Sequence, residues 1–281
     1  MNLVDLHVHS TASDGTLTPS EVICLAKKNH ISALALTDHD TVDGIDEALM
    51  AGKCLQVEVI PGIELSCSYM QKEIHMVGLF IDHKDTTFQE ELNQMRRTRE
   101  LRNEEMVKRF QEHHIAISLS ALRERFGNAV ITRAHFARYL YEQGMVSSVR
   151  EAFDRYLNDH GPCFVPRDKM PCEKTIQLIH DAGGIAILAH PVLYKMSSTA
   201  LSDMVSHLKK HGLDGIEAIY STYTPADEVQ IRKLARENNL LISGGSDFHG
   251  TNKPHIALGN GKGNLKVPFD VLTNLRRYHS G

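Results

Sequence analysis

The chain has 281 residues, of which 42% are hydrophobic and 23% charged, and its formal net charge at pH 7 is −4. This composition is typical of a globular protein with one large domain, or with one domain that carries an insertion. The net charge excludes a strong attraction of the whole chain to nucleic acid or to anionic membranes. The count of 17 histidines is high, and histidine is the commonest metal ligand in proteins.

The five cysteines are scattered, odd in number and without a CxxC pair. This pattern argues against a disulfide framework and against a cysteine zinc finger, and it favours a reducing compartment. The first residues do not read as a secretion signal, and no apolar run approaches the length of a membrane span. We therefore expect a cytoplasmic protein that does not cross a membrane.

Apolar runs rich in β-branched residues alternate with helical patterns along much of the chain. The helix at Thr18-Pro19-Ser20-Glu21 and the helix at Thr224-Pro225-Ala226-Asp227 each begin with an N-cap threonine followed by proline. A third helix after Pro171 is expected to end at Gly183-Gly184. The alternation predicts an α/β fold, either a parallel barrel or a doubly wound sheet. Seven strands are predicted, at Leu3–His7, Ala33–Asp38, Val57–Leu65, Ile74–Ile81, Ile185–His190, Gly215–Tyr220 and Leu240–Gly245.

The alternation stops between about Thr87 and Asp168, where no strand is evident. Phe88 to His114 has the pattern of one long charged helix, and Leu119 to Leu157 that of several shorter ones. We therefore predict a barrel domain made of residues 1–86 and 169–281, with a helical insertion at 87–168. Acidic residues accompany the arginines of the long helix, so these arginines are expected on a solvated face. They are Arg96, Arg97, Arg99 and Arg102.

Metal-binding side chains cluster at the ends of the first two predicted strands. Alternate residues of a strand face the same way, so His7 and His9 could bind one ion, although an HxH pattern alone is weak support. Asp14 follows in a short loop, and Thr37-Asp38-His39-Asp40 closes the second strand. The flanking acids Asp38 and Asp40 could orient the imidazoles of metal ligands or simply cap the next turn.

The same pattern recurs at later strand ends. Glu64 lies in the third strand, and a turn after it could bring His75 back opposite that carboxylate. His190 ends another strand, and Asp247 and His249 follow the last one. The carboxyl ends of barrel strands form the active-site face of α/β barrels, so these groups are expected to converge there.

The expected ligands are imidazoles and carboxylates without thiolates, which suits Zn²⁺, Mn²⁺ or Fe²⁺. Nine such groups exceed the needs of one ion, so we expect two or three divalent ions bridged by a carboxylate. Clusters of this kind lower the pKa of a bridging water and neutralise a phosphate in hydrolysis. The predicted nucleophile is therefore a metal-bridging hydroxide, and no protein side chain is assigned as the catalytic acid.

These segments resemble the conserved motifs of the PHP (polymerase and histidinol phosphatase) superfamily, in the order and spacing of that family, across nearly the whole chain. The flanks Ser13-Asp14-Gly15-Thr16 and Gly244–Gly250 are most similar to stand-alone bacterial phosphoesterases, a group with nucleoside 3′,5′-bisphosphate phosphatases and 5′→3′ exoribonucleases. The motifs are Asp5-Leu6-His7-Val8-His9-Ser10, Thr37-Asp38-His39-Asp40, Pro61-Gly62-Ile63-Glu64, Ala189-His190-Pro191 and Ser246-Asp247-Phe248-His249.

The resemblance implies a distorted seven-stranded (β/α) barrel, the PHP fold, with two or three metal ions. It also implies that basic residues of the helical insertion hold substrate phosphate, which Arg133, Lys169 and Arg167 would do here. Arg138 is expected in a surface ion pair, and His135 could be structural or touch substrate. The implied metal ligands are His7, His9, Asp14, His39, Glu64, His75, His190, Asp247 and His249.

Three functions remain open at this point. The favoured one is hydrolysis of nucleotide phosphate monoesters of the 3′,5′-bisphosphate type, together with short 5′-phosphorylated oligonucleotides. The alternative is a phosphatase for a small metabolite such as histidinol phosphate. A module that binds metal or nucleotide without catalysis is the third, and the complete ligand set disfavours it. The expected partner is a small phosphorylated substrate, and no protein partner is evident from the sequence.

Overall fold

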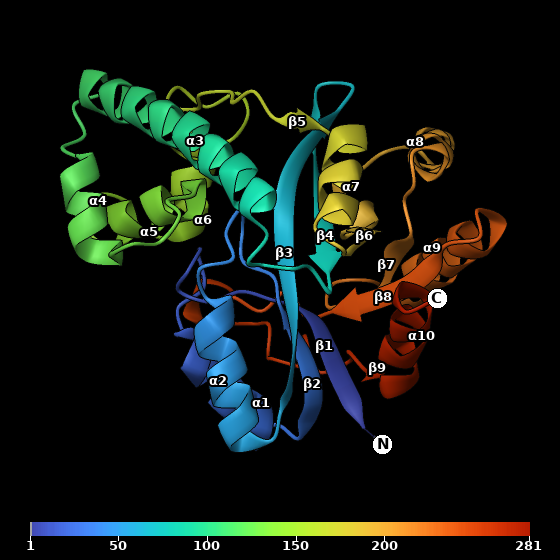
Figure 1. Ribbon diagram of the computed structural model, residues 1–281. Helices are drawn as coiled ribbons and strands as arrows, with labels where there is room; N and C mark the ends of the chain where they lie inside the picture. The colour runs from blue at the N-terminus through green and yellow to red at the C-terminus, as the bar shows by residue number, and fades with distance from the viewer. Residues whose placement is uncertain (1) are drawn as a thin grey trace.

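The computed structural model describes residues 2–281, and its centre is a curved sheet of nine strands (Figure 1). All seven predicted strands are present, and the two others, β5 and β9, are only two residues long. The strands are β1 (Leu3–Val8), β2 (Ile31–Leu36), β3 (Glu58–Tyr69), β4 (Lys72–Leu79), β5 (Met170–Pro171), β6 (Ile185–Leu188), β7 (Gly215–Tyr220), β8 (Leu241–Gly245) and β9 (Val267–Pro268).

The sheet curls into a nearly closed barrel. Its strand order is β8-β7-β6-β4-β3-β2-β1-β9, with β5 paired to β3. Where β8 comes back beside β1, Val8 forms a parallel bridge with Phe248, and the Asp247 N–H donates to the carbonyl of His7 at 2.8 Å. The predicted barrel is therefore confirmed, and it closes through the residues after β8 that carry Asp247 and His249.

The barrel is distorted because its strands are not all parallel. β1, β2 and β3 are parallel neighbours, as are β6, β7 and β8. Between them, β4 pairs antiparallel with both β3 and β6. The expected turn between β3 and β4 is thus confirmed, and it sets the amino end of β4 at the same face as the carboxyl ends of its parallel neighbours.

Six helices pack on the barrel, and their ends follow the sequence signals. Both predicted capping boxes are present, at Thr18 with Glu21 and at Thr224 with Asp227. The helix after Pro171 ends just before Gly183, whose φ of 74° needs a residue without a side chain. The barrel helices are α1 (Pro19–Lys28), α2 (Ile45–Leu55), α7 (Cys172–Asp181), α8 (Ser198–Lys210), α9 (Pro225–Glu237) and α10 (Phe269–His279), with short 3₁₀ turns at Pro191–Tyr194 and Gly250–Asn252.

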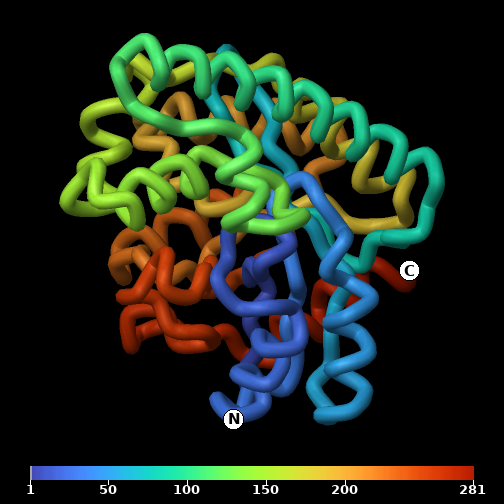
Figure 2. Tube along the Cα trace, turned by 90° about the vertical axis from the view of Figure 1, so that its left-hand side faces the viewer, coloured from blue at the N-terminus to red at the C-terminus, as the bar shows by residue number. Residues whose placement is uncertain are grey.

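Within the described chain, no strand interrupts the helices between β4 and β5. We call residues 87–168 the cap; in both ribbon and tube views its green helices lie above the blue strands β1 and β2 (Figures 1 and 2). The cap has an apolar cluster of its own, in which the rings of Phe110 and Phe136 stack 5.8 Å apart. Its helices are α3 (Thr86–Glu112), α4 (Leu119–Phe126), α5 (Arg133–Glu142), α6 (Val149–Ala152) and a π-helical turn (Phe153–Leu157).

The helices of residues 2–281 include none that combines the length and the apolar composition needed to cross a membrane.

Candidate metal centre

Two buried histidines lie at the carboxyl end of β1. His7 lies in β1 and His9 directly after it, and both side chains are fully buried. The Nδ1 atom of His7 lies 2.9 Å from a carboxylate oxygen of Glu217 on β7, so Nδ1 donates and Nε2 is left for another partner. The second oxygen of Glu217 accepts the backbone N–H of His190 at 2.8 Å. One buried carboxylate therefore orients two candidate ligands.

Glu64 lies at the middle of the cluster, with its carboxylate surrounded by five imidazole rings. Its Oε1 atom lies 2.8 Å from His75 Nδ1 and 2.9 Å from His190 Nε2. Its Oε2 atom lies 3.1 to 3.2 Å from a ring nitrogen of each of His39, His7 and His9.

The β3–β4 hairpin explains how His75 reaches Glu64. His75 pairs with Ser66, two residues beyond Glu64 on the same face of β3. Because β4 runs antiparallel to β3, His75 lies near the amino end of its strand, unlike the ligands expected at carboxyl ends. The Tyr194 hydroxyl accepts the backbone N–H of His75 at 3.0 Å, which fixes this end of β4.

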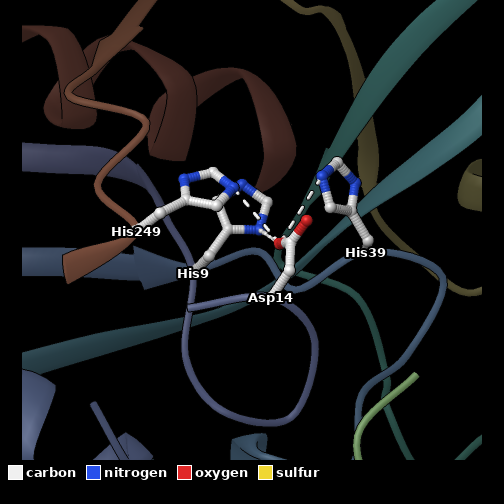
Figure 3. A group of neighbouring side chains, drawn as sticks. All are labelled: His9, Asp14, His39 and His249. Carbon is white, nitrogen blue, oxygen red and sulfur yellow. Dashed lines mark ion pairs between the residues drawn. The ribbon is translucent and has the colours of Figure 1, made fainter. Parts of the chain in front are cut away.

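Asp14 reaches the cluster from the loop after β1. Figure 3 shows the rings of His9, His39 and His249 around its carboxylate, and Asp14 Oδ1 lies 3.2 Å from His249 Nε2 and 3.9 Å from His39 Nε2. The other oxygen, Oδ2, accepts a hydrogen bond from the Thr132 hydroxyl of the cap at 3.1 Å. A cap residue thus orients this candidate ligand.

A neighbouring carboxylate, Asp38, shapes the loop that carries Asp14. It accepts hydrogen bonds from the backbone and hydroxyl groups of Ser10 and Ser13, at 2.6 to 3.2 Å. The loop is so tight that a Cβ on Gly15 would lie 2.6 Å from the carbonyl oxygen of His9. Among the hydrogen bonds of residues 2–281, Asp38 makes none to an imidazole, so it orients the loop rather than a ligand ring.

Asp247 completes the group from the residues after β8. Its Oδ1 atom faces His249 Nδ1 at 3.3 Å and His9 Nε2 at 3.4 Å. Its Oδ2 atom accepts hydrogen bonds from the Tyr220 hydroxyl at 2.5 Å and the Lys253 ammonium at 2.6 Å. One oxygen is thereby occupied, and the other is directed to the histidines.

The structure brings all nine predicted ligands together in four overlapping groups, each close enough to share one ion. In each group one ligand atom per residue lies within 4.8 Å of the others. The groups are His9, Asp14, His39 and His249; His7, Glu64 and His190; His7, His9 and Asp247; and His39, Glu64 and His75.

The unpaired atoms of these residues fit bound cations. Buried nitrogen and oxygen atoms normally have hydrogen-bond partners, because an unpaired one loses its hydration without compensation. Several ligand atoms of this cluster have none. They are His7 Nε2, His9 Nδ1 and Nε2, Asp14 Oδ1, His39 Nδ1 and His190 Nδ1.

Burial and neighbouring charge pull the imidazole pKa values apart. Burial alone would lower the pKa of His9, but the Asp247 and Glu64 carboxylates, at 3.4 and 3.2 Å from its Nε2 atom, outweigh it and raise that pKa to about 9. Burial is likewise outweighed at His75, whose pKa the Glu64 charge raises to about 10, whereas burial prevails at His39 and lowers its pKa to about 3. An imidazole binds metal only when neutral, so metal binding here releases protons.

A cavity of about 370 Å³ opens beside this cluster, between the barrel and the cap. Asp14, His39, His75 and His190 line one side of it. Apolar side chains, among them Phe164, line another part. Five cationic side chains also line it: Arg99, Arg102, Arg133, Arg167 and Lys169.

Two carboxylates hold four of these five cations. Buried Asp40 forms ion pairs with Arg99 and, at 3.2 Å, with Arg167, and the two arginine charges hold the pKa of Asp40 well below its usual range against the effect of burial. Glu73, which lines the cavity, holds the other two cations. It lies 3.3 Å from Arg133 and 3.4 Å from Lys169, so the three predicted phosphate-binding residues all lie in the cavity wall.

The expectation that the arginines of the long helix are solvated is wrong for Arg99 and Arg102. Both are buried, with 7% and 8% of their surface exposed, whereas Arg97 is exposed as expected. The spacing of these two arginines could have predicted their burial, because positions 99 and 102 continue the buried stripe of α3 at steps of three and four residues. That stripe contains Phe88, Leu92, Met106 and Phe110.

Contacts of Arg138 and His135 show the roles of these two cap residues. Arg138 forms an ion pair with Glu142 at 2.8 Å, as expected. His135 is buried and its Nδ1 accepts the backbone N–H of Thr132 at 2.9 Å, so it has a structural role at the start of α5.

A barrel of this shape, with imidazoles and carboxylates gathered beside a cationic cavity, defines the class as a hydrolase of phosphate esters. The chain belongs to the PHP family, because the PHP domain model matches residues 5–162.

Named relatives agree with that class. The chain is 36% identical over 249 residues to the 5′-3′ exoribonuclease Rnm of Escherichia coli K12, covering 88% of this chain and 85% of that protein. It is 34% identical over 247 residues to a 3′,5′-nucleoside bisphosphate phosphatase of Chromobacterium violaceum, covering 88% and 87%. A solved structure of a C. violaceum amidohydrolase with bound sulfate and no metal has a TM-score of 0.88 at 31% identity, covering 98% of this chain and 96% of that one.

Proposed function

We propose that this protein removes phosphate from nucleotides that carry a second phosphate, of the 3′,5′-bisphosphate type, and also acts on short 5′-phosphorylated RNA. The observation that carries the proposal is the single cavity that joins the metal-suited cluster to five cationic side chains. A substrate with one phosphate needs fewer cations than this wall supplies. The names of the two relatives support nucleotide and RNA substrates.

In this proposal the nine clustered residues hold two or three divalent ions, which are Mn²⁺, Zn²⁺ or Fe²⁺. Imidazole and carboxylate ligands without thiolate suit these ions. Glu64 would be suited to hold two of these ions, because its two oxygens face different histidines. Bound ions of this kind lower the pKa of a water and stabilise charge on the phosphate oxygens.

The protein's own residues then position the substrate. Arg133, Lys169 and Arg167 bind substrate phosphate from the wall of the cavity. Their carboxylate partners, Glu73 and Asp40, hold these long side chains in place before substrate arrives, which reduces the entropy lost on binding.

We further propose that residues 87–168 form a substrate-binding cap on a barrel domain made of 1–86 and 169–281. The separate apolar cluster of the cap supports this division. The protein is proposed to work in the cytoplasm, because all five cysteines are free thiols, as a reducing compartment allows.

The test is phosphate release by the Mn²⁺-loaded protein from four substrates: adenosine 3′,5′-bisphosphate, AMP, histidinol phosphate and a short 5′-phosphorylated RNA. The proposal predicts a preference for the bisphosphate or the RNA. A preference for histidinol phosphate would contradict the substrate class while leaving the metal centre in place. Absence of hydrolysis of all four, with metal bound, would favour a binding module.

A further inference from the structure

Arg102 is the one cation of the cavity wall whose charge has no acidic partner in residues 2–281. The other four share Asp40 or Glu73 (see above), whereas the side-chain contact of Arg102 is a hydrogen bond from Nε to the Asn103 side-chain oxygen at 2.9 Å. Its Nη2 atom is buried and has no hydrogen-bond partner. We propose that Arg102 is the specificity-determining residue that binds the second, unhydrolysed phosphate of the substrate. This proposal rests on the proposed function.

An unpaired guanidinium inside a protein is costly, so its position needs a compensating ligand. Arg102 is 8% exposed and lines the cavity that also contains the metal-suited cluster. Burial, and then the charges of Arg99, Arg167 and Arg133, lower the pKa of Arg102 to about 9. These neighbours repel it, and a phosphate dianion placed among them would relieve that repulsion.

The cap holds Arg102 in a fixed place relative to the metal centre. Arg99 lies one turn earlier on α3 and is tied to the barrel through its ion pair with Asp40. Asn103, the next residue, donates a hydrogen bond to the carbonyl of Ile131 at 3.1 Å. The Arg102 guanidinium is thus fixed through Nε; it lines the cavity and forms no ion pair within residues 2–281, so it can donate to the oxygens of a phosphate bound there.

The chemistry of the site requires two different phosphate positions for a bisphosphate. The scissile phosphate has to lie at the metal-suited cluster, and the second phosphate has to lie elsewhere in the same cavity. Arg133 and Lys169 each form a direct ion pair with Glu73, whereas Arg102 forms none within residues 2–281 and the Glu73 charge acts on it only without direct contact. Arg102 is therefore the better partner for the second phosphate.

The test compares Arg102→Met with Arg97→Met, an exposed arginine of the same helix, on three substrates. These are adenosine 3′,5′-bisphosphate and the single-phosphate nucleotides 3′-AMP and 5′-AMP. Loss of one charge-assisted contact should raise KM for the bisphosphate about 10-fold or more in Arg102→Met. The kcat and KM values for whichever single-phosphate nucleotide is hydrolysed should remain unchanged, and Arg97→Met should match the wild type on all three. An equal effect of Arg102→Met on one- and two-phosphate substrates would overturn the proposal.

Two further readouts separate this proposal from the proposed function. Calorimetric titration of the chelated, full-length protein with adenosine 3′,5′-bisphosphate tests binding without hydrolysis. Binding about 10-fold weaker in Arg102→Met supports the role of Arg102 even if no nucleotide is hydrolysed, and equal binding overturns it.

Thermal unfolding should show no loss of stability in Arg102→Met, because the variant removes an unpaired buried charge. If that variant fails to fold, Arg102→Lys, which keeps the charge, should show a smaller rise in KM for the bisphosphate alone; an equal change for all substrates again overturns the proposal.

Discussion

The metal-suited cluster and the cationic wall lie in one cavity, but different forces position their residues. The cluster is set by backbone geometry, because nearly every member lies in a barrel strand or in the few residues after one. The wall consists of long side chains from the cap and the segment after it, and two carboxylates of the barrel region, Asp40 and Glu73, hold four of its cations. In the proposed function, the barrel therefore supplies the metal ligands and also fixes the cations that bind substrate phosphate.

Glu64→Gln tests the barrel side of this comparison and should have the largest effect. The amide carries no negative charge, so five imidazoles lose their central carboxylate and any bound cations lose an anionic ligand. Turnover should fall on the order of 10³-fold or more, with loss of bound metal. Phosphate release and metal analysis measure both, with Glu58→Gln on the exposed end of β3 as the matched control. Full turnover in Glu64→Gln would show that the cluster is not the reaction centre.

Asp40→Asn tests the link between barrel and cap. The change removes the negative charge that forms ion pairs with both Arg99 and Arg167. Asparagine tolerates the φ of 53° at this position, so the backbone should not be strained. Breaking a buried ion pair from one side should destabilise the fold by roughly 3 kcal/mol. Urea unfolding measures it, and Asp43→Asn, an exposed neighbour that pairs with Arg96, should leave stability nearly unchanged. Equal stabilities of the two variants would mean that Asp40 does not hold the wall.

Glu217→Gln leaves all nine candidate metal ligands in place and removes a carboxylate that orients two of them, His7 and His190. Both oxygens of Glu217 accept hydrogen bonds, from His7 Nδ1 and from the backbone N–H of His190, and an amide can accept only on one side. Metal affinity should fall about 10- to 100-fold, as it does when such outer partners are lost. Titration with a competing chelator measures the affinity, and Glu237→Gln on the surface of α9 is the control. An unchanged affinity would leave Glu217 with a structural role only.

The smallest effect is expected far from the cavity, at His180. Its Nε2 atom lies 2.7 Å from Asp214, and that hydrogen bond raises the pKa of His180. A raised folded-state pKa stabilises the fold below the ordinary value of 6.5 and loses that contribution as pH rises through the folded value. The stability advantage of wild type over His180→Asn should therefore be within about 1 kcal/mol at pH 5.5 and shrink toward pH 8.5. Urea unfolding across this range measures the difference, and a pH-independent difference would contradict the ion pair.

Local sequence signals were sufficient for the barrel. Seven β-branched runs predicted seven strands. Polar residues within these strands or in the loops after them predicted the nine clustered side chains, because the carboxyl ends of parallel strands meet at one face of a barrel. Glu217 was missed even though it is a single charge inside the buried run Gly215–Tyr220, which is itself a sign of a buried hydrogen-bonded partner.

The cap was harder to predict, because its arginines take their place from distant partners. The spacing of Arg99 and Arg102 along α3 indicated a buried face, but the abundance of nearby acids suggested solvent. Only the fold brings Asp40 to Arg99, from a position 59 residues away in the sequence. The role of a charged helix face therefore depends on long-range contacts that the local pattern does not contain.

The most direct test of the proposed metal centre is a joint measurement of metal content and phosphate release on one protein sample, before chelation, after it, and after addition of Mn²⁺. We expect two or three divalent ions per chain, loss of phosphate release from adenosine 3′,5′-bisphosphate when they are removed, and recovery when Mn²⁺ is returned. A metal-free protein that hydrolyses the bisphosphate at the full rate would contradict this expectation.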